Sequence, residues 1–196
     1  EITTRLVGSE MCIRDRDEEI QMIYDQTGDK TVVPSRPERY ITVDGERIDL
    51  SKEKYEQYAT KRGQMQFEML GNIIDNPTYR SMSDTDKAFV IDSVYEYADK
   101  TTKSEISSYR LDGWVKTAAQ SDLSPEDYIL FRAATVDIEG DKDENGKTIP
   151  GSKKKKVLNV IDQMNVSDEV KDKYYYAAGY DEDTISDAPW HGWGWW

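Results

Sequence analysis

The chain has 196 residues, a length that suits one compact domain better than two. Its 39 acidic and 26 basic residues give a formal net charge of −13, which disfavours non-specific binding of the whole chain to nucleic acid or to an anionic membrane surface. One cysteine and one histidine exclude an internal disulfide and a four-ligand zinc site made of these two residue types. No apolar run approaches the roughly 20 residues of a membrane-spanning helix, and no signal peptide is visible.

The N-terminal segment is set apart from the rest of the chain by its sequence. The run Leu6–Arg16 reads LVGSEMCIRDR and resembles a translated sequencing-adapter fragment. We therefore expect residues 1–16 to be non-native and disordered, and we assign no chemistry to Cys12, which lies within them. From Asp17 onward, apolar residues recur at helical spacing, which predicts a short helix that ends near Gly28.

A β-hairpin is predicted over residues 39–50. Its arms, Arg39–Val43 and Glu46–Leu50, flank the dipeptide Asp44-Gly45, which tolerates the positive φ angles of a two-residue type I′ turn. An isolated hairpin is only marginally stable in water, so one of its faces must pack on helices. The apolar residues expected on that face are Ile41, Val43, Ile48 and Leu50.

Two long helices are predicted after the hairpin. Ser51 is a suitable N-cap for a helix over residues 52–75, which ends before Pro77. Ser83 and Asp86 have the spacing of a capping box for the second helix. In the first helix a stripe at helical spacing is expected to face the core: Ala59, Gly63, Phe67, Leu70, Gly71 and Ile74.

Three further helices are predicted in the second half of the chain. Ser124 and Pro125 provide an N-cap and a first-turn proline for a helix over residues 125–138. This helix is apolar on nearly every side, so we expect it to be the most buried element. Helices over residues 153–164 and 168–178 follow, and together they form a helical hairpin.

The predicted elements define one helical domain over residues 17–180. Its fold class is mainly α, a single compact bundle with one small β-hairpin and a C-terminal helical hairpin. Residues 181–196 form a separate tail that contains four of the five tryptophans. Exposed indoles serve as docking anchors, so Trp190 and Trp193 are candidate partner-binding residues; the alternative is that the tail folds back on the bundle or frays.

The polar loop Gly140–Gly151 partly matches a calcium-binding loop. Asp141, Asp143 and Asn145 occupy positions one, three and five of an EF-hand loop. Position twelve is Ser152, however, where the motif requires a bidentate glutamate. We therefore interpret the loop as a solvated turn, keep its three polar residues as weak metal-binding candidates, and expect no cofactor.

Four consecutive lysines open the helix predicted over residues 153–164: Lys153, Lys154, Lys155 and Lys156. Positive charge is unfavourable at the start of a helix, which makes the run a candidate site for phosphate or for an acidic partner. In a helix-turn-helix, however, the next helix would present Asp168 and Glu169 to DNA. The competing interpretation is a solvated face that pairs with the acidic groups of the protein itself.

No catalytic motif is recognisable in the sequence. His191 has no nucleophile or second ligand near it, and among 39 acidic residues a pair of carboxylates identifies nothing. The sequence contains no GxSxG, HExxH or kinase-like motif. We expect no catalysis by this chain, and an enzyme with an unrecognised site is kept as an alternative.

Several short blocks are specific in combination, although each alone is weak. They are residues 23–29 (IYDQTGD), 40–50 (YITVDGERIDL), 58–64 (YATKRGQ), 111–114 (LDGW), 131–134 (FRAA), 140–143 (GDKD), 151–154 (GSKK), 175–180 (YYAAGY) and 188–190 (APW). In order and spacing, these blocks resemble the C-terminal region of large polyvalent-type proteins of tailed phages and prophages. The resemblance covers residues 17–190, approximately.

The resemblance implies a segment of a much longer multidomain protein that travels with the virion or is delivered by it. It supplies no catalytic residues for this chain. We therefore expect a structural or interaction module that acts in the virion or in the host bacterial cytoplasm. Its partners would be other phage proteins or other domains of the same long chain. The alternative is a nucleic-acid-binding module that uses the lysine run.

Overall fold

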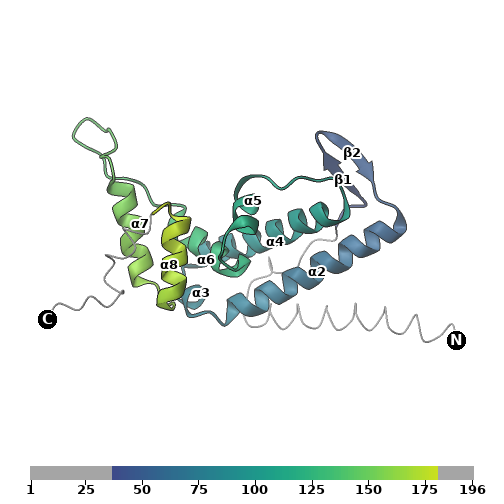
Figure 1. Cartoon of the computed structure of the whole chain (residues 1–196), viewed down its shortest axis with the longest axis horizontal. Helices are drawn as coiled ribbons and strands as arrows, with labels where there is room; N and C mark the ends of the chain where they lie inside the picture. The colour runs from purple at the N-terminus through teal and green to yellow at the C-terminus, as the bar shows by residue number, and fades with distance from the viewer. Residues whose placement is uncertain (1–36, 181–196) are drawn as a thin grey trace. The chain divides into compact units, whose positions relative to one another are not determined.

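The computed structural model describes residues 37–180 (Figure 1). These residues form one β-hairpin and seven helices: β1 (Tyr40–Val43), β2 (Glu46–Asp49), α2 (Lys52–Ile74), α3 (Pro77–Ser81), α4 (Asp84–Ile106), α5 (Gly113–Gln120), α6 (Pro125–Thr135), α7 (Ser152–Gln163) and α8 (Asp168–Ala177). The predicted fold class, mainly helical with one small hairpin, is confirmed. The adapter-like start, the helix predicted after Asp17 and the tail 181–196 lie outside the described residues.

The described residues group into two compact units. Unit 1 comprises residues 37–74 and 91–115, and unit 2 comprises residues 75–90 and 116–180. Unit 1 therefore contains the hairpin, α2 and most of α4, whereas unit 2 contains α3, α6, α7 and α8.

The hairpin of unit 1 has the predicted turn but buries less than predicted. Asp44 and Gly45 have φ angles of 51° and 83°, as a type I′ turn requires. Ile41 and Ile48 are cross-strand partners, yet Ile41 is 1% exposed and Ile48 is 41% exposed. The expectation that Ile48 packs on the helices is therefore wrong. All four residues of β2 are exposed, so Ile41 is the one buried residue of the two strands.

Helix α2 begins at the predicted cap but turns a different face inward. The amide of Lys54 donates to the Ser51 hydroxyl at 3.3 Å, which confirms the N-cap. Of the predicted stripe, only Leu70 is fully buried, and Gly71 is exposed. The residues buried on α2 are Tyr58, Gln66, Met69, Leu70 and Ile73. The face was mispredicted because it includes the polar side chain of Gln66, which an apolar pattern does not count.

Several of the later helices begin directly after an N-cap residue. The Ser83 hydroxyl accepts from the Asp86 amide at 3.2 Å and donates to its carboxylate at 2.7 Å, so Ser83 is the N-cap of α4 and its contact with Asp86 is confirmed. Ser124 makes the corresponding contacts with Asp127 at the start of α6. Helix α3 was not predicted. There the Asn76 side chain accepts from the Thr78 amide at 2.9 Å, so the Asn-Pro pair that ends α2 also starts a new helix.

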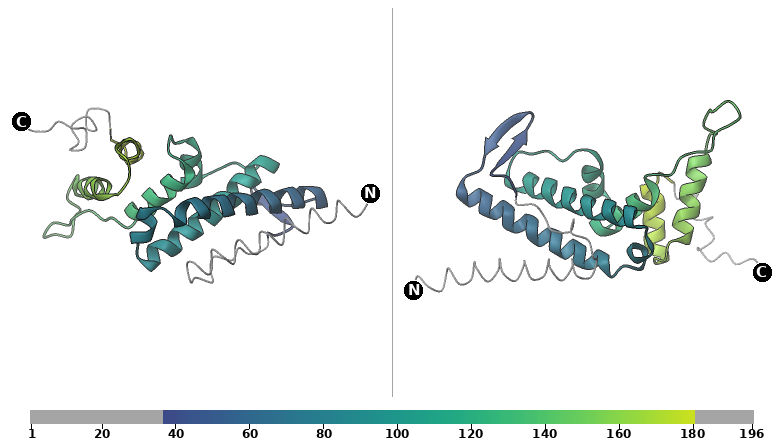
Figure 2. Two further views of the ribbon diagram at one scale, coloured as in Figure 1. Left: turned by 90° about the horizontal axis from the view of Figure 1, so that it is seen from below. Right: turned by 180° about the vertical axis from the view of Figure 1, so that it is seen from behind.

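Unit 2 is held together by a cluster of apolar and aromatic side chains. Helices α7 and α8 lie side by side, and α6 also packs against α7 (Figure 1, Figure 2). The Phe131 and Tyr174 rings stack at 5.1 Å between centroids. Helix α6 is deeply buried, as predicted, but ends at Thr135. The buried members of the cluster are Leu123, Phe131, Val157, Ile161, Met164, Tyr174, Tyr175 and Tyr180.

Candidate functional site

The predicted lysine run lies on the first turns of α7, but its four members have different environments. Lys156 is half-buried; its ammonium group contacts Asp141 Oδ1 at 2.6 Å and donates to the Glu139 carbonyl at 3.1 Å. Lys153, Lys154 and Lys155 are exposed. Within the described part of the chain, none of these three forms an ion pair. Lys156 therefore holds the preceding loop to α7, and three cations remain available to a ligand.

A groove of about 530 Å³ lies at the start of α7, within unit 2. Its apolar surface comes from three helices, with Phe131 on α6, Val157 on α7 and Ala177 at the end of α8. Two exposed lysines stand at its edge. The complete lining is Phe131, Thr135, Gly151, Lys153, Lys154, Val157, Ala177 and Ala178. We call this feature the lysine groove.

Further apolar surface occurs close to the lysine groove in the chain. The exposed large apolar residues of the described segment are Ile48, Val136, Ile149 and Tyr176. The last three of these four lie within two positions of a groove-lining residue. These three exposed apolar residues thus adjoin groove-lining residues along the chain. The groove thus combines apolar area with unpaired positive charge.

The end of α8 fixes one wall of the lysine groove. Gly179 has a φ angle of 82°, and the Tyr180 amide donates to the Tyr175 carbonyl at 3.0 Å, which is a Schellman motif. The motif directs Tyr180 back toward α7, where its hydroxyl donates to the Lys154 carbonyl at 2.7 Å. The Lys154 ammonium group lies 4.4 Å from the centroid of the same ring. The backbone and side chain of Lys154 are therefore both held by the last described residue.

The loop before α7 is closed by its own side chains. Asp143 Oδ1 accepts from the amides of Asn145 and Lys147, each at 2.9 Å. An isolated antiparallel bridge joins Lys142 to Thr148 below this turn. The carboxylate of Asp143 thus satisfies the backbone of its own turn. The Asp143 carboxylate and the backbone bridge thus stabilise a projecting turn, which is visible beyond α7 in Figure 1.

The weak metal-binding candidates do not form a cluster of ligands. Asp141 pairs with Lys156, Asp143 caps its own turn, and Asn145 is exposed. Ser152, at position twelve, accepts from the Asp141 amide at 2.8 Å and donates to the Ile149 carbonyl at 2.7 Å. In residues 37–180, no group of three or more His, Cys, Asp or Glu side chains is placed to hold a metal ion.

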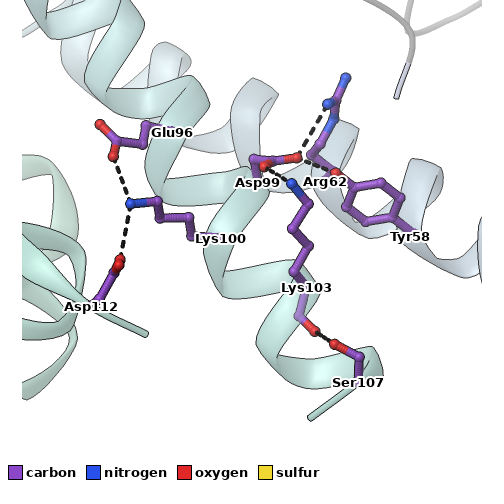
Figure 3. Close-up of polar contacts among 8 residues, drawn as sticks. All are labelled: Tyr58, Arg62, Glu96, Asp99, Lys100, Lys103, Ser107 and Asp112. Atoms are coloured by element: carbon purple, nitrogen blue, oxygen red, sulfur yellow. Dashed lines mark hydrogen bonds and ion pairs between the residues drawn. The ribbon is translucent and has the colours of Figure 1, made fainter. Parts of the chain in front are cut away.

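Unit 1 contains a second group of polar side chains, centred on Asp99 of α4 (Figure 3). Lys103 contacts Asp99 Oδ2 at 2.6 Å, Arg62 contacts Oδ1 at 3.4 Å, and the Tyr58 hydroxyl donates to Oδ1. Arg62 and Asp99 are mostly buried, with 11% and 24% of their side chains exposed. We call these four residues the Asp99 cluster. It joins α2 to α4 and was not predicted.

The chemistry of the Asp99 cluster is that of a structural contact. Burial first, and then the hydrogen bond to Asp99, raise the pKa of the Tyr58 hydroxyl above its usual value. The phenol therefore remains protonated at neutral pH and is neither a nucleophile nor a base. The carboxylate is shared by two cations, so its charge is neutralised. The cluster connects two helices, and its polar groups bind one another.

A neighbouring set of contacts fastens the start of α5 to α4. Lys100 contacts Glu96 at 2.9 Å and Asp112 at 3.0 Å. The Trp114 indole donates to Glu96 at 2.9 Å, and its ring centroid lies 6.2 Å from that of Tyr97. The charged residues of α4 in these contacts and in the Asp99 cluster therefore have structural roles within unit 1.

The remaining predicted site residues, Trp190 and Trp193, lie outside the described residues. None of the helices within residues 37–180 combines the length and apolarity needed to cross a membrane. Comparison of the chain with protein-family models, with curated proteins and with solved structures finds no match.

Proposed function

We propose that this chain is a structural or interaction module of a large phage- or prophage-encoded multidomain protein and has no catalytic activity of its own. Its working surface is the lysine groove of unit 2. Its partners are other virion or phage proteins or other domains of the same long protein. The module acts in the virion or in the cytoplasm of the host bacterium.

The observation that carries this proposal is the state of the three exposed lysines. They stand beside apolar surface at the positive end of α7, and no carboxylate of the described residues neutralises them, although the whole chain has a net charge of −13. Cations at the start of a helix interact unfavourably with the positive end of its dipole and destabilise that helix slightly. A binding role explains why such an arrangement is kept on an otherwise acidic protein.

The resemblance to phage polyvalent-type proteins supports the same surface. Three of the blocks that carry the resemblance are FRAA (131–134), GSKK (151–154) and YYAAGY (175–180). They are distant in sequence, yet they supply all of the groove lining except Thr135 and Val157. The groove is thus built from the segments that carry the resemblance, and it supports an interaction role for the C-terminal region of such proteins.

The proposal is tested by selecting a displayed library of random peptides against the full chain. Selected peptides are then measured against the variant K153Q/K154Q/K155Q and against a matched control, K54Q/K116Q/K147Q, which removes the same charge from exposed lysines elsewhere. We expect peptides whose affinity falls about tenfold or more in the groove variant and is kept in the control, since each cation paired with a carboxylate in a partly desolvated site is worth about 1 kcal/mol. No enriched peptide, or equal binding to all three proteins, would refute the proposal.

A nucleic-acid role is separated by a titration with labelled duplex and single-stranded DNA at low and physiological salt. Neutralisation of several phosphates gives an affinity that falls steeply with salt. We expect no binding at physiological ionic strength, because the acidic chain repels the DNA backbone. Submicromolar binding that is lost in K153Q/K154Q/K155Q would assign the lysine groove to nucleic acid. Turnover abolished by a point substitution would instead favour the enzyme alternative.

A further inference from the structure

The described chain ends at the lysine groove. Tyr180 contacts Lys154 through both its hydroxyl and its ring, and Ala177 and Ala178, just before it, line the groove. Residues 181–196 therefore continue from a point on the edge of the groove, beside the exposed lysines. Their sequence is DEDTISDAPWHGWGWW, which contains four acidic residues and four tryptophans.

We propose that residues 181–196 of the same chain bind in the lysine groove and compete there with the external partner. This inference rests on the proposed function of the groove. It names the chemistry that the groove recognises, namely a cluster of carboxylates followed by aromatic side chains. The chain would carry its own competitor, and a partner would share this composition.

Charge is the first argument for this occupant. Asp181, Glu182 and Asp183 follow Tyr180 directly, and three exposed lysines on the adjacent helix lack ion pairs among the described residues. Opposite charges brought together at the edge of an apolar groove attract one another more strongly than in bulk water. The acidic cluster of residues 181–183 is therefore complementary to Lys153, Lys154 and Lys155 in sign and in number.

The size of the groove and the length of residues 181–196 also favour this occupant. The groove volume of about 530 Å³ is sufficient for a large side chain, and its surface includes Phe131 and Val157. Tryptophan is enriched among the residues that anchor binding partners in such sites. Sixteen extended residues span roughly 50 Å, so each tail tryptophan is able to reach the groove. A tether this short also gives an effective concentration of about a millimolar, which favours binding within one chain.

The binding is tested by acrylamide quenching of tryptophan fluorescence in the full chain. Because four of the five tryptophans belong to residues 181–196, release of the indole that fills the groove exposes part of the tryptophan emission. We expect K153Q/K154Q/K155Q to raise the quenching constant by about a quarter and to shift the emission to longer wavelength. The control K54Q/K116Q/K147Q should match the wild type. Equal quenching in all three proteins would overturn the inference.

A second variant separates this inference from the proposed function. D181N/E182Q/D183N/D187N keeps the tryptophans and removes the negative charge of the tail. Peptides selected on the groove should bind this variant about tenfold more tightly than the wild type, because the tethered competitor has been weakened. Equal affinity would overturn tail binding and leave the groove as a partner site. Quenching that depends on protein concentration would show that the tail binds a second copy, which also contradicts the inference.

Discussion

The two units use charged side chains in opposite ways. In unit 1, one mostly buried carboxylate is shared by Arg62, Lys103 and the Tyr58 hydroxyl, so every charge of the Asp99 cluster has a partner. In unit 2, Lys153 and Lys154 line the lysine groove, and these two lysines and Lys155 are exposed without an ion pair among the described residues. Paired and mostly buried charges hold helices together, whereas exposed unpaired charges add little to stability and remain free to bind. The contrast therefore separates the architecture of the chain from its interaction surface.

The strongest way to break this comparison is to remove the shared carboxylate. Asp99→Asn removes the carboxylate that the mostly buried Arg62 and Lys103 share, and we expect it to lower the free energy of unfolding by about 3 kcal/mol. Urea denaturation followed by circular dichroism measures the loss. The matched control is Asp112→Asn, which removes an exposed partner of Lys100 and should cost about 0.5 kcal/mol. Equal losses in the two variants would show that the Asp99 cluster is no different from a surface ion pair.

A second test concerns the loop that leads to the lysine groove. A Cβ atom at Gly140 would lie 2.6 Å from Thr148 Cγ2 and 2.9 Å from Ser152 Oγ. Gly140→Ala should therefore destabilise unit 2 by about 2 kcal/mol through overpacking. Hydrogen exchange should show lost protection at the amides of Asp143 and Ile149, which are bonded within the loop. Unchanged protection and stability would mean that Thr148 moves aside at no cost.

Two buried tyrosines sharpen the comparison between the units. Tyr58 donates to Asp99, whereas the Tyr174 hydroxyl has no hydrogen-bond partner within the described structure. Tyr58→Phe should cost about 1.5 kcal/mol, because a hydrogen bond to a charged group is lost. Tyr174→Phe should be neutral or slightly stabilising, because an unsatisfied buried hydroxyl is removed. Equilibrium denaturation measures the free energy of unfolding of both variants. A larger loss for Tyr174→Phe than for Tyr58→Phe would contradict the view that only the Tyr58 hydroxyl has a hydrogen-bond partner.

Alkaline pH should destabilise both units. Burial raises the pKa of the hydroxyls of Tyr58 and Tyr174 in the folded state, while the unfolded chain titrates near pH 10. Below that pH the contribution to stability is complete. Above it each tyrosine costs about 1.4 kcal/mol per pH unit, because only the unfolded state releases the proton. The slope between pH 10 and 11, measured by urea denaturation, should fall in Tyr58→Phe and in Tyr174→Phe. An unchanged slope in either variant would contradict this account.

The smallest effect is expected at the lysine groove. K153Q/K154Q/K155Q should leave stability unchanged or raise it by about 0.5 kcal/mol, because positive charge is removed from the positive end of α7. Thermal unfolding at low salt measures this difference. A loss of more than about 1 kcal/mol would mean that these lysines support the fold, in the manner of Lys103, and would remove the basis for the interaction surface.

The features that could be predicted from the sequence are local. Ser83, Ser124 and Ser167 each lie three residues before the amide they cap, and Asp44-Gly45 specifies its own turn. Helix α3 was missed because it has only five residues. Caps and turns could be predicted because the residues that form them are close in the sequence, and α3 was missed because so short a helix gives no periodic pattern.

The Asp99 cluster could not be predicted, because Tyr58 and Arg62 precede Asp99 by 41 and 37 residues. Among 39 acidic residues nothing in the sequence distinguishes this carboxylate. The lysine run was visible, but the separate role of Lys156 depends on a contact across the loop to Asp141. The pair Ala177-Ala178 before Gly179 was the one available signal for the groove, because small residues at a helix end leave space beside it.

The projecting loop between α6 and α7 offers a place for labels. Its tip at Asn145-Gly146 is exposed, and the chain below the tip is fastened by the bridge between Lys142 and Thr148 and by the contacts of Ser152. Because the entropy of loop closure grows slowly with length, an epitope tag or a fluorophore-binding peptide inserted at this tip should leave unit 2 folded. Affinity capture or surface immobilisation through that insertion would leave residues 181–196 chemically unaltered.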